Sequence, residues 1–301
     1  MDKKKLSGYI YVFTSYLIWG ILPIYWKQLS ILSSVELLAI RIIMATVSFI
    51  AIVYITKNIH FIDYLKNKKT RLQLLLSSFF IAINWGVFIY AVNSGYVVQA
   101  SLGYYINPLV SVFLGIFILK EKLSKIQYFA IFLALIGVLY MAISHGQFPW
   151  ISLLLAFSFA LYGLLKKLYQ LDSLNSLLAE IIFLLPFMIF ALAFGDERGQ
   201  WVLSSSLYEW IFILLAGVVT IVPLYLFSEG AKRIPLSAVG FLQYIEPTLM
   251  LTIGVLLYGE AFTLQHGISF GFIWLGLIIY SVSNFTQYLS IESTKTVKKS
   301  L

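Results

Sequence analysis

Ten apolar stretches of about 20 residues follow one another along the chain, and they constrain its fold more than any other feature. Each is long enough to cross about 30 Å of hydrocarbon as a helix that rises 1.5 Å per residue. The stretches are too long and too uniformly apolar to be the alternating strands of a barrel. The sequence therefore predicts an all-α polytopic membrane protein with ten transmembrane helices. We expect these at about 8–29, 34–56, 72–94, 97–119, 125–144, 148–168, 174–194, 207–228, 236–258 and 264–288.

The composition also fits a surface that faces lipid. Sixty per cent of the 301 residues are hydrophobic and 11% are charged, too few charges to cover a soluble domain of this length. A net charge of +8 would suggest a nucleic-acid partner in a soluble protein, but here the basic residues stand between apolar stretches, so we predict none. The chain has no cysteine, and its three histidines (His60, His145 and His266) are scattered. We therefore predict no metal site and no cofactor.

Lysine and arginine fall almost entirely into alternate loops, which orients the predicted helices. With the N-terminus inside, 18 of the 21 basic residues lie on the cytoplasmic side, while Lys27 and Arg198 lie outside and Arg41 lies within a span. The positive-inside rule then places both termini in the cytoplasm. The first stretch lacks a small-residue cleavage site, so we interpret it as a retained span. The cytoplasmic set is Lys3, Lys4, Lys5, Lys57, Lys66, Lys68, Lys69, Arg71, Lys120, Lys122, Lys125, Lys166, Lys167, Lys232, Arg233, Lys295, Lys298 and Lys299.

The two halves of the chain resemble each other at an offset of 139 residues. Both halves contain the spacing Pro-x6-Gly-x5-Glu. The alternative to a repeat is chance similarity among apolar helices, which would have to produce this spacing twice. Because each half holds five spans, an odd number, the second half must enter the membrane from the opposite side. We predict two inverted five-helix repeats, residues 1–146 and 147–301, an architecture typical of secondary transporters. The matched pairs are Arg41 with Glu180, Tyr105 with Tyr244, Ile106 with Ile245, Pro108 with Pro247, Gly115 with Gly254 and Glu121 with Glu260.

Several segments resemble one known family. Five-plus-five inverted halves, each with a proline in its fourth helix and a glutamate closing it, resemble the EamA family of the drug/metabolite transporter superfamily. The chain is most similar to the RarD-type (chloramphenicol-sensitive protein) branch. The resemblance covers nearly the whole chain. The segments that carry it are 16–23 (YLIWGILP), 84–85 (NW), 91–93 (AVN), 100–110 (ASLGYYINPLV), 184–186 (LLP), 240–245 (GFLQYI) and 247–250 (PTLM).

The resemblance implies movement of a metabolite or drug across the bacterial inner membrane, without fixing substrate or direction. One residue departs from the family pattern: Glu246 stands before the second proline, where we expect a small residue. If relatives work with a small residue there, Glu246 is no essential part of a shared mechanism. It would then tune substrate charge, favouring a cationic or amine-bearing solute.

Three charged residues lie within predicted spans. A charge at the bilayer centre costs about 2.5–3.5 kcal/mol on insertion scales, so Arg41, Glu180 and Glu246 are candidates for the substrate or ion pathway. Arg41 and Glu180 lie nearer opposite ends of their spans, and the alternative is that each snorkels to its interface. Their depths differ by roughly 13 Å at 1.5 Å per residue, so we expect two separate cavity ends and no resting ion pair. The deepest is Glu246, whose alternative role is that of a protonated structural acid.

Other candidates follow from depth and from the prolines. Pro108 and Pro247 each remove a helix bond, and the freed carbonyls are tolerated at membrane depth where they line a cavity. The alternative is a packing kink. The polar and aromatic candidates for the pathway, whose alternative is ordinary packing, are Asn84, Asn107, Trp19, Trp85, Tyr104, Tyr105, Tyr162 and Tyr244. We expect Gly20, Gly103, Gly163 and Gly240 to allow close contacts between helices.

The leading hypothesis is a secondary carrier that works by alternating access, either coupled to protons or exchanging solutes. Its predicted partners are a small-molecule substrate, membrane lipids and protons, and the sequence does not predict an oligomeric state. The alternative is a membrane-embedded enzyme or a lipid-handling protein. An enzyme would need a nucleophile–base cluster, and none occurs at helical spacing, so we predict no catalytic residues. A Walker-type sequence is also missing, which argues against ATP-driven transport.

Overall fold

The computed structural model describes residues 3–57, 61–94, 96–144, 149–194, 206–259 and 262–299. Ten helices within these residues are long and apolar enough to cross a membrane, and no strand occurs among them. This confirms the predicted all-α polytopic fold. Four residues named above lie outside the described ranges: His60, His145, Arg198 and Glu260.

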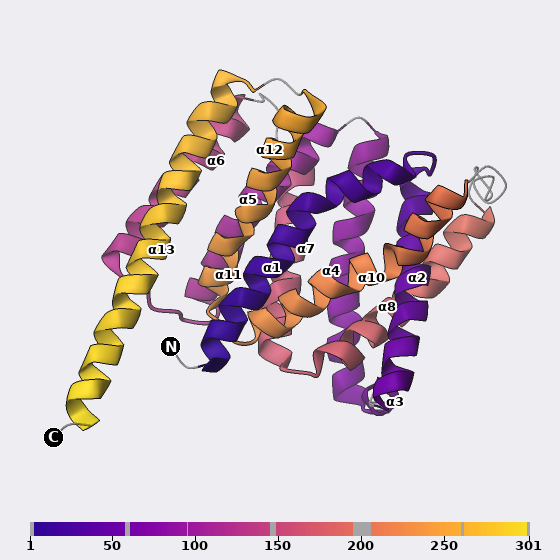
Figure 1. The fold of residues 1–301 in the computed structure, drawn as a ribbon, viewed down its shortest axis with the longest axis horizontal. Helices are drawn as coiled ribbons and strands as arrows, with labels where there is room; N and C mark the ends of the chain where they lie inside the picture. The colour runs from indigo at the N-terminus through magenta and orange to yellow at the C-terminus, as the bar shows by residue number, and fades with distance from the viewer. Residues whose placement is uncertain are drawn as a thin grey trace.

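Most helices begin and end close to the expected positions, but the last one, expected to end at 288, continues to Lys299. Their courses can be followed in Figure 1. Two helices start earlier than expected, at Lys3 and Lys68, because lysines continue the helix beyond the apolar stretch. The first half comprises α1 (Lys3–Trp26), a 3₁₀ turn η1 (Lys27–Leu29), α2 (Ser34–Thr56), α3 (Phe61–Lys66), α4 (Lys68–Asn93), α5 (Val97–Phe117) and α6 (Lys125–Ser144). The second half comprises α7 (Trp150–Tyr169), α8 (Ser173–Phe194), α10 (Leu207–Ala231), α11 (Leu236–Gln243), α12 (Ile245–Tyr258) and α13 (Leu264–Lys299).

The helix starts repeat along the chain. α2 and α8, α4 and α10, α5 and α11, and α6 and α13 each begin 139 residues apart. Helices matched in this way run in opposite directions in Figure 1, where α4 rises and α10 descends. Both observations are compatible with the inverted repeat. One matched pair differs in form: α5 is continuous through Pro108, whereas its counterpart is divided at Tyr244 into α11 and α12.

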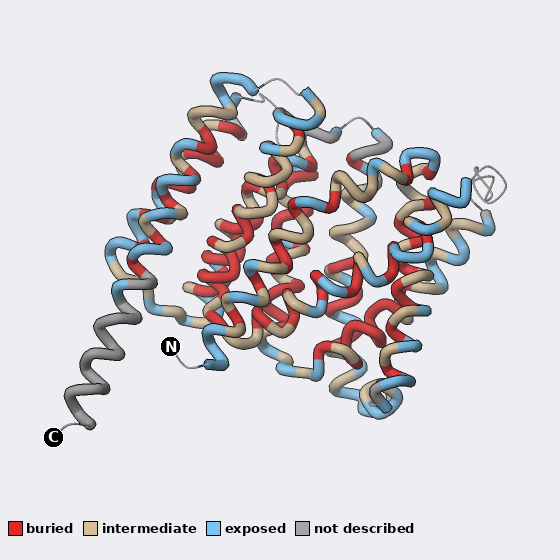
Figure 2. Tube along the Cα trace, in the orientation of Figure 1, coloured by how far each residue is buried: buried red, intermediate tan, exposed pale blue. Residues whose placement is uncertain are grey.

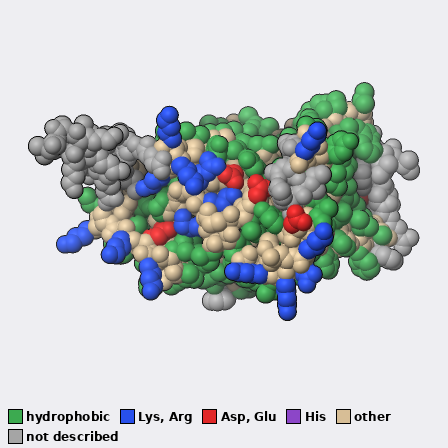
Figure 3. Space-filling model, turned by 90° about the horizontal axis from the view of Figure 1, so that it is seen from below, with side chains coloured by type: hydrophobic (Ala, Val, Ile, Leu, Met, Phe, Trp, Pro, Cys, Tyr) green, Lys and Arg blue, Asp and Glu red, His purple; other side chains and the backbone are tan. Residues whose placement is uncertain are grey.

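The basic residues gather on one face of the bundle, which we call the basic face. α1 begins at this face and α13 ends at it, at the bottom of Figure 1, and Figure 3 views it from below. Helix ends on the other side form the opposite face, which carries Lys27. Described residues on the basic face include Lys57, Lys66, Lys68, Lys69, Arg71, Lys120, Lys122, Lys125, Lys232 and Arg233.

Small residues let the central helices approach closely. A Cβ added to Gly217 in α10 would lie 2.2 Å from the carbonyl oxygen of Met44 in α2. The same holds for Gly20, Gly103 and Gly240, whose added Cβ atoms would lie within 2.6–3.0 Å of a neighbouring helix. These contacts confirm the role expected of the three glycines. At Gly163 the nearest atom is a phenylalanine ring carbon at 3.2 Å, so this contact is looser. Figure 2 shows the resulting buried segments in the central helices.

The approach of α10 to α2 predicts a stability difference between two glycine substitutions. Gly217→Ala should destabilise the protein by about 1–3 kcal/mol, because the methyl group overlaps backbone that cannot move cheaply. In α13, Gly271 has no atom within 4 Å of an added Cβ, so Gly271→Ala should be neutral or stabilising by up to about 1 kcal/mol. Thermal unfolding of both purified variants in detergent measures the difference. Equal midpoints would contradict the close α2–α10 crossing.

Candidate functional site

A cavity of about 420 Å³ lies between the two halves of the bundle. Its walls come from the last eight residues of α1, the first eight of α2, the upper part of α4 and the first halves of α5 and α7. These are the portions nearest the opposite face in Figure 1. Gln243 of α11 and Glu246 and Met250 of α12 complete the wall, with Leu224 of α10. The volume falls within the range typical of small-molecule sites, about 300–1,000 Å³.

Several predicted pathway residues meet in this cavity, and others do not. The predicted residues that line it are Arg41, Glu246, Asn84, Asn107, Trp19, Trp85 and Tyr104. The predicted residues that are not part of its wall are Glu180, Tyr105, Tyr162, Tyr244, Pro108 and Pro247. Glu180 and Tyr162 lie nearer the basic face than the cavity does. Tyr105, Tyr244 and the two prolines lie close to its depth, so the rotation of their helices keeps them out of its wall.

Arg41 is held at the cavity wall by aromatic rings. Its guanidinium carbon lies 4.7 Å from the ring centre of Trp26 and 5.8 Å from that of Trp85. Its Nε donates to the hydroxyl of Thr220 in α10 at 3.4 Å. No carboxylate among the described residues forms an ion pair with it. Cation–π contacts therefore fix its position while its charge remains available to the cavity.

Glu246 faces the same cavity from the first turn of α12. Within the described part of the chain, its carboxyl group has no hydrogen-bond or ion-pair partner. One turn earlier, Gln243 also lines the cavity; its side chain is buried, and its Oε1 has no hydrogen-bond donor. α12 is held against α1, because a Cβ on Gly20 would lie 2.7 Å from Leu249 and 3.2 Å from the carbonyl oxygen of Glu246. The acidic group thus has a fixed place and no internal partner.

The two prolines act on cavity-lining residues. Proline cannot bond the carbonyl four residues earlier, so Pro108 frees the carbonyl of Tyr104 and Pro247 frees that of Gln243. Both of these residues line the cavity. The helix that contains Pro247 is divided into α11 and α12 at Tyr244, directly after the freed carbonyl of Gln243, whereas α5 remains continuous through Pro108. The expected kink at Pro247 therefore occurs as a break three residues earlier in the chain.

Below the cavity, α5 and α11 cross in tight contact. A Cβ on Gly240 would lie 2.6 Å from the carbonyl oxygen of Pro108. At the basic face, the carboxylate of Glu121 accepts bonds from the backbone N–H of Leu236 (2.6 Å) and Ser237 (3.0 Å), and from the Ser237 hydroxyl (2.6 Å). Glu121 follows α5 and the donor groups lie at the start of α11, so these bonds join the two halves. They also place a negative charge at a helix N-terminus, where it is favourable.

Glu180 lies on the basic-face side of the bundle, in a buried ion pair. Lys166 Nζ, in the last turn of α7, lies 2.6 Å from Glu180 Oε1 in α8. The Tyr162 hydroxyl donates to the other carboxylate oxygen at 3.2 Å. Both charged residues are at most 6% exposed, so neither snorkels to the surface. From the sequence we predicted that Lys166 lies on the cytoplasmic side with the other basic residues. In the structure its side chain is buried, because Glu180 compensates its charge. Arg41 and Glu180 form no ion pair with each other.

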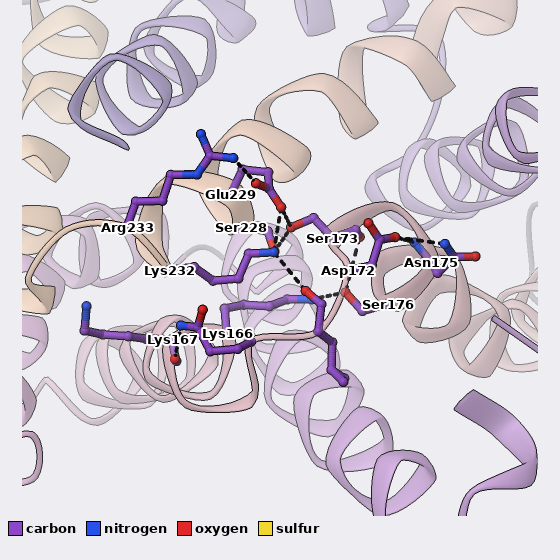
Figure 4. A network of polar contacts seen from close by, with 12 residues as sticks. Lys166, Lys167, Asp172, Ser173, Asn175, Ser176, Ser228, Glu229, Lys232 and Arg233 are labelled. Carbon is purple, nitrogen blue, oxygen red and sulfur yellow. Dashed lines mark hydrogen bonds and ion pairs between the residues drawn. The ribbon is translucent and has the colours of Figure 1, made fainter. Parts of the chain in front are cut away.

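A second ionic cluster adjoins this pair (Figure 4). The carboxylate of Glu229 accepts from Lys232 at 2.6 Å, from the Ser173 hydroxyl at 2.6 Å and from Arg233. Arg233 also donates to the hydroxyl of Ser7 in α1 at 2.9 Å. Lys167 donates to the carbonyl of Ile234 after α10. These bonds connect the ends of α1, α7, α8 and α10 on the basic face.

Two of the predicted aromatic residues have packing roles. The ring of Tyr105 packs edge-on against Phe270 of α13 at 5.1 Å. Tyr244 is 1% exposed in the same apolar cluster, and its hydroxyl has no partner. Their predicted depth in the membrane made both tyrosines candidates for the pathway, but they face α6 and α13 and not the cavity. Gln243 lines the cavity but was not predicted as a site residue. The repeat offset contained the signal, since it matches Gln243 with Tyr104 beside the first proline.

Comparisons with known proteins identify the family. The profile of the "EamA-like transporter family" matches residues 6–143 and again 149–282. "Uncharacterized transporter YojE" of Bacillus subtilis (strain 168) is 43% identical over 286 residues, covering 94% of this chain and 95% of that protein. "Protein RarD" of Escherichia coli (strain K12) is 36% identical over 283 residues, covering 93% and 96%.

A solved structure, titled "Crystal structure of protein", has the same fold. Its TM-score is 0.71 at 16% sequence identity, and the match covers 92% of this chain and 98% of that one. At this identity the likeness concerns the fold alone, whereas the family profile and the relatives cover nearly the full chain. The chain is thus a multi-pass membrane transporter that belongs to the EamA-like transporter family, in the branch that contains the RarD proteins.

Proposed function

We propose that this protein is a secondary transporter that moves a small organic solute across the bacterial inner membrane by alternating access. The 420 Å³ cavity is its solute site. The basic face is cytoplasmic, so the cavity belongs to the outer half of the membrane and the conformation is outward-facing. Membrane lipids surround the ten spans, and protons drive or accompany the cycle through Glu246.

The asymmetry of packing along the bundle carries this proposal. On the basic-face side, α11 is buried at seven of its eight residues, and the end of α7 is buried from Tyr162 to Lys166. On the other side, α12 buries only Pro247 and Gly254. The cavity is confined to the side of the bundle nearer the opposite face, and the side nearer the basic face is closed by packing, hydrogen bonds and ion pairs. This is one of the two states that alternating access requires. The second state would separate α5 from α11.

The orientation predicts which positions an impermeant reagent reaches. The chain has no cysteine, so single substitutions can be labelled without background. Ser30→Cys, in the exposed turn after η1, should react with an impermeant maleimide added to intact cells. Asn67→Cys, exposed between α3 and α4 on the basic face, should react only after the membrane is opened. Labelling of Asn67→Cys in intact cells would reverse the proposed topology.

Closure at the basic face predicts the effect of weakening the Glu121 contact. Ser111 is 3% exposed and lies between α5 and α11, one turn beyond the cavity-lining Asn107. Ser111→Cys should label slowly from the cytoplasmic side of inverted vesicles. Adding Glu121→Gln should speed this labelling about tenfold, because loss of charge-assisted bonds worth about 1.5–3 kcal/mol shifts the equilibrium toward the other state.

A matched variant separates this effect from general loss of charge. The carboxylate of Asp172 also lies at the basic face, but its side-chain bonds are local, to the N–H and amide of Asn175. Asp172→Asn should leave the labelling rate of Ser111→Cys within about twofold. Equal acceleration by both variants, or by neither, would remove Glu121 from the closure.

Proton coupling predicts a charge movement that depends on Glu246. A pH jump applied to protein-containing vesicles on a solid-supported membrane should displace protons onto this carboxyl group and give a transient current. Glu246→Gln keeps the shape of the side chain but cannot titrate, so the current should fall to about the level of protein-free vesicles. Glu209→Gln, a substitution at the exposed start of α10 that a capping box tolerates, serves as the control. An unchanged current in Glu246→Gln would refute the coupling role.

A further inference from the structure

Two opposite charges face one cavity without neutralising each other. Arg41 has aromatic and hydroxyl partners but no carboxylate, and Glu246 has no polar partner among the described residues. The same bundle pairs other charges closely at the basic-face side, where Lys166 and Glu180 lie 2.6 Å apart. Uncompensated charges at membrane depth are costly and mark functional positions. The cavity therefore has two opposite charges in its wall that form no ion pair with each other.

The fold holds these charges apart. Arg41 belongs to α2, which packs against α8 and α10, and its guanidinium is fixed between the rings of Trp26 and Trp85. Glu246 belongs to α12, which packs against α1 through the close contact at Gly20. In Figure 1, α1 and α10 cross the space between α2 and α12. Tyr104 also lines the cavity.

We infer, on the basis of the proposed solute site, that the cavity selects a small zwitterion: an anionic group binds Arg41 and a cationic amine binds Glu246. The buried, unpartnered Oε1 of Gln243 supplies a second acceptor beside Glu246 for the N–H groups of the amine. The rest of the wall is mainly apolar and aromatic, so it suits a compact apolar body between the two charges. The aromatic residues are Trp19, Trp26, Trp85, Phe88, Tyr104 and Phe159.

A solute with one charge fits the cavity less well. An anion would satisfy Arg41 but leave Glu246 unpaired or repelled, and a cation would do the reverse to Arg41. Buried charges left without a partner weaken binding strongly, whereas a zwitterion compensates both at once. The preference should therefore be at least about tenfold in Kd over analogues that lack either charge.

Binding of matched probes tests this inference. Alanine, leucine and phenylalanine are zwitterions of increasing size, and each has an amine without the carboxylate and an acid without the amine. Binding to the purified protein in nanodiscs can be followed by quenching of tryptophan fluorescence, since three tryptophans line the cavity. We expect at least one zwitterion to bind at least about tenfold more tightly than its amine and its acid. Equal binding of a singly charged analogue, or no binding of any of the three zwitterions, would overturn the inference.

Two variants assign the charges. Arg41→Gln should abolish the preference for the zwitterion over its amine, and Glu246→Gln should abolish the preference over its acid. The controls remove charges from the same side of the bundle outside the cavity: Lys27→Gln and Glu209→Gln should keep both preferences. Retained preferences in both cavity variants, with thermal unfolding midpoints near that of the unmodified protein, would also overturn the inference. Should a cavity variant fail to fold, the comparison of probes on the unmodified protein decides.

The labelling of Ser111→Cys distinguishes this inference from the proposed transport cycle. Zwitterion binding to a protein in which Ser111 never becomes accessible from the cytoplasmic side would reject alternating access and keep the selectivity. Access that switches, without any zwitterion preference, would reject the selectivity alone.

Discussion

Hydrocarbon offers neither hydrogen bonds nor stabilisation of charge, and every other feature of this bundle depends on that constraint. Backbone groups are satisfied within helices, and hydroxyls such as those of Thr46 and Ser78 donate to carbonyls of the preceding turn. Lys166 is buried because Glu180 compensates it. Against this background, a cavity with Arg41 and Glu246 facing it is a place where the fold leaves charge available.

The crossing of α5 and α11 connects the cavity to the basic face. The carbonyl oxygen of Pro108 lies so close to Gly240 that no side chain would fit there. About one helical turn nearer the opposite face are Tyr104 and Gln243, whose carbonyls the two prolines free and which line the cavity. The two helices start 139 residues apart, yet α5 is continuous and its counterpart is divided at Tyr244. Similar sequences in unequal conformations are what an inverted repeat needs if its halves exchange roles.

Sequence alone predicted the spans, because the transfer of about 20 apolar residues into lipid is a local property that neighbours do not alter. The orientation rests on the lysine and arginine pattern, which the basic face in Figure 3 reproduces. The sequence alone could not predict the partner of Glu180. The repeat matched Glu180 with Arg41, whereas the ion pair forms with Lys166, 14 residues away across the α7–α8 turn. The side chains that contact each other depend on how each helix is rotated and where the helices cross. A uniformly apolar helix has no residue spacing that indicates its rotation or its crossing point.

The same limit explains the aromatic candidates. Tyr105 and Tyr104 are adjacent, at nearly equal depth, but a rotation of 100° per residue in a helix turns one toward Phe270 and the other toward the cavity. Only the repeat offset carried rotational information, because it matched Tyr104 with Gln243, and both line the cavity. Matched positions in α5 and in α11–α12 therefore face the same way, whereas the matched pair Arg41 and Glu180 does not, since only Arg41 lines the cavity.

A single carboxyl group at the site has a consequence for energy coupling. Under the proposed function, Glu246 can hold a proton or the amine of a bound zwitterion, but a protonated carboxyl no longer attracts the amine. Loading and protonation then compete, and by linkage each weakens the other by the same factor. Competition for one group lets protons move one way while solute moves the other. Because Arg41 stays charged in both states, the cavity is neutral when empty and ionised, carries one positive charge when protonated, and is neutral again when the zwitterion is bound. The exchange would thus move net charge, and the membrane potential would act on the protonated step.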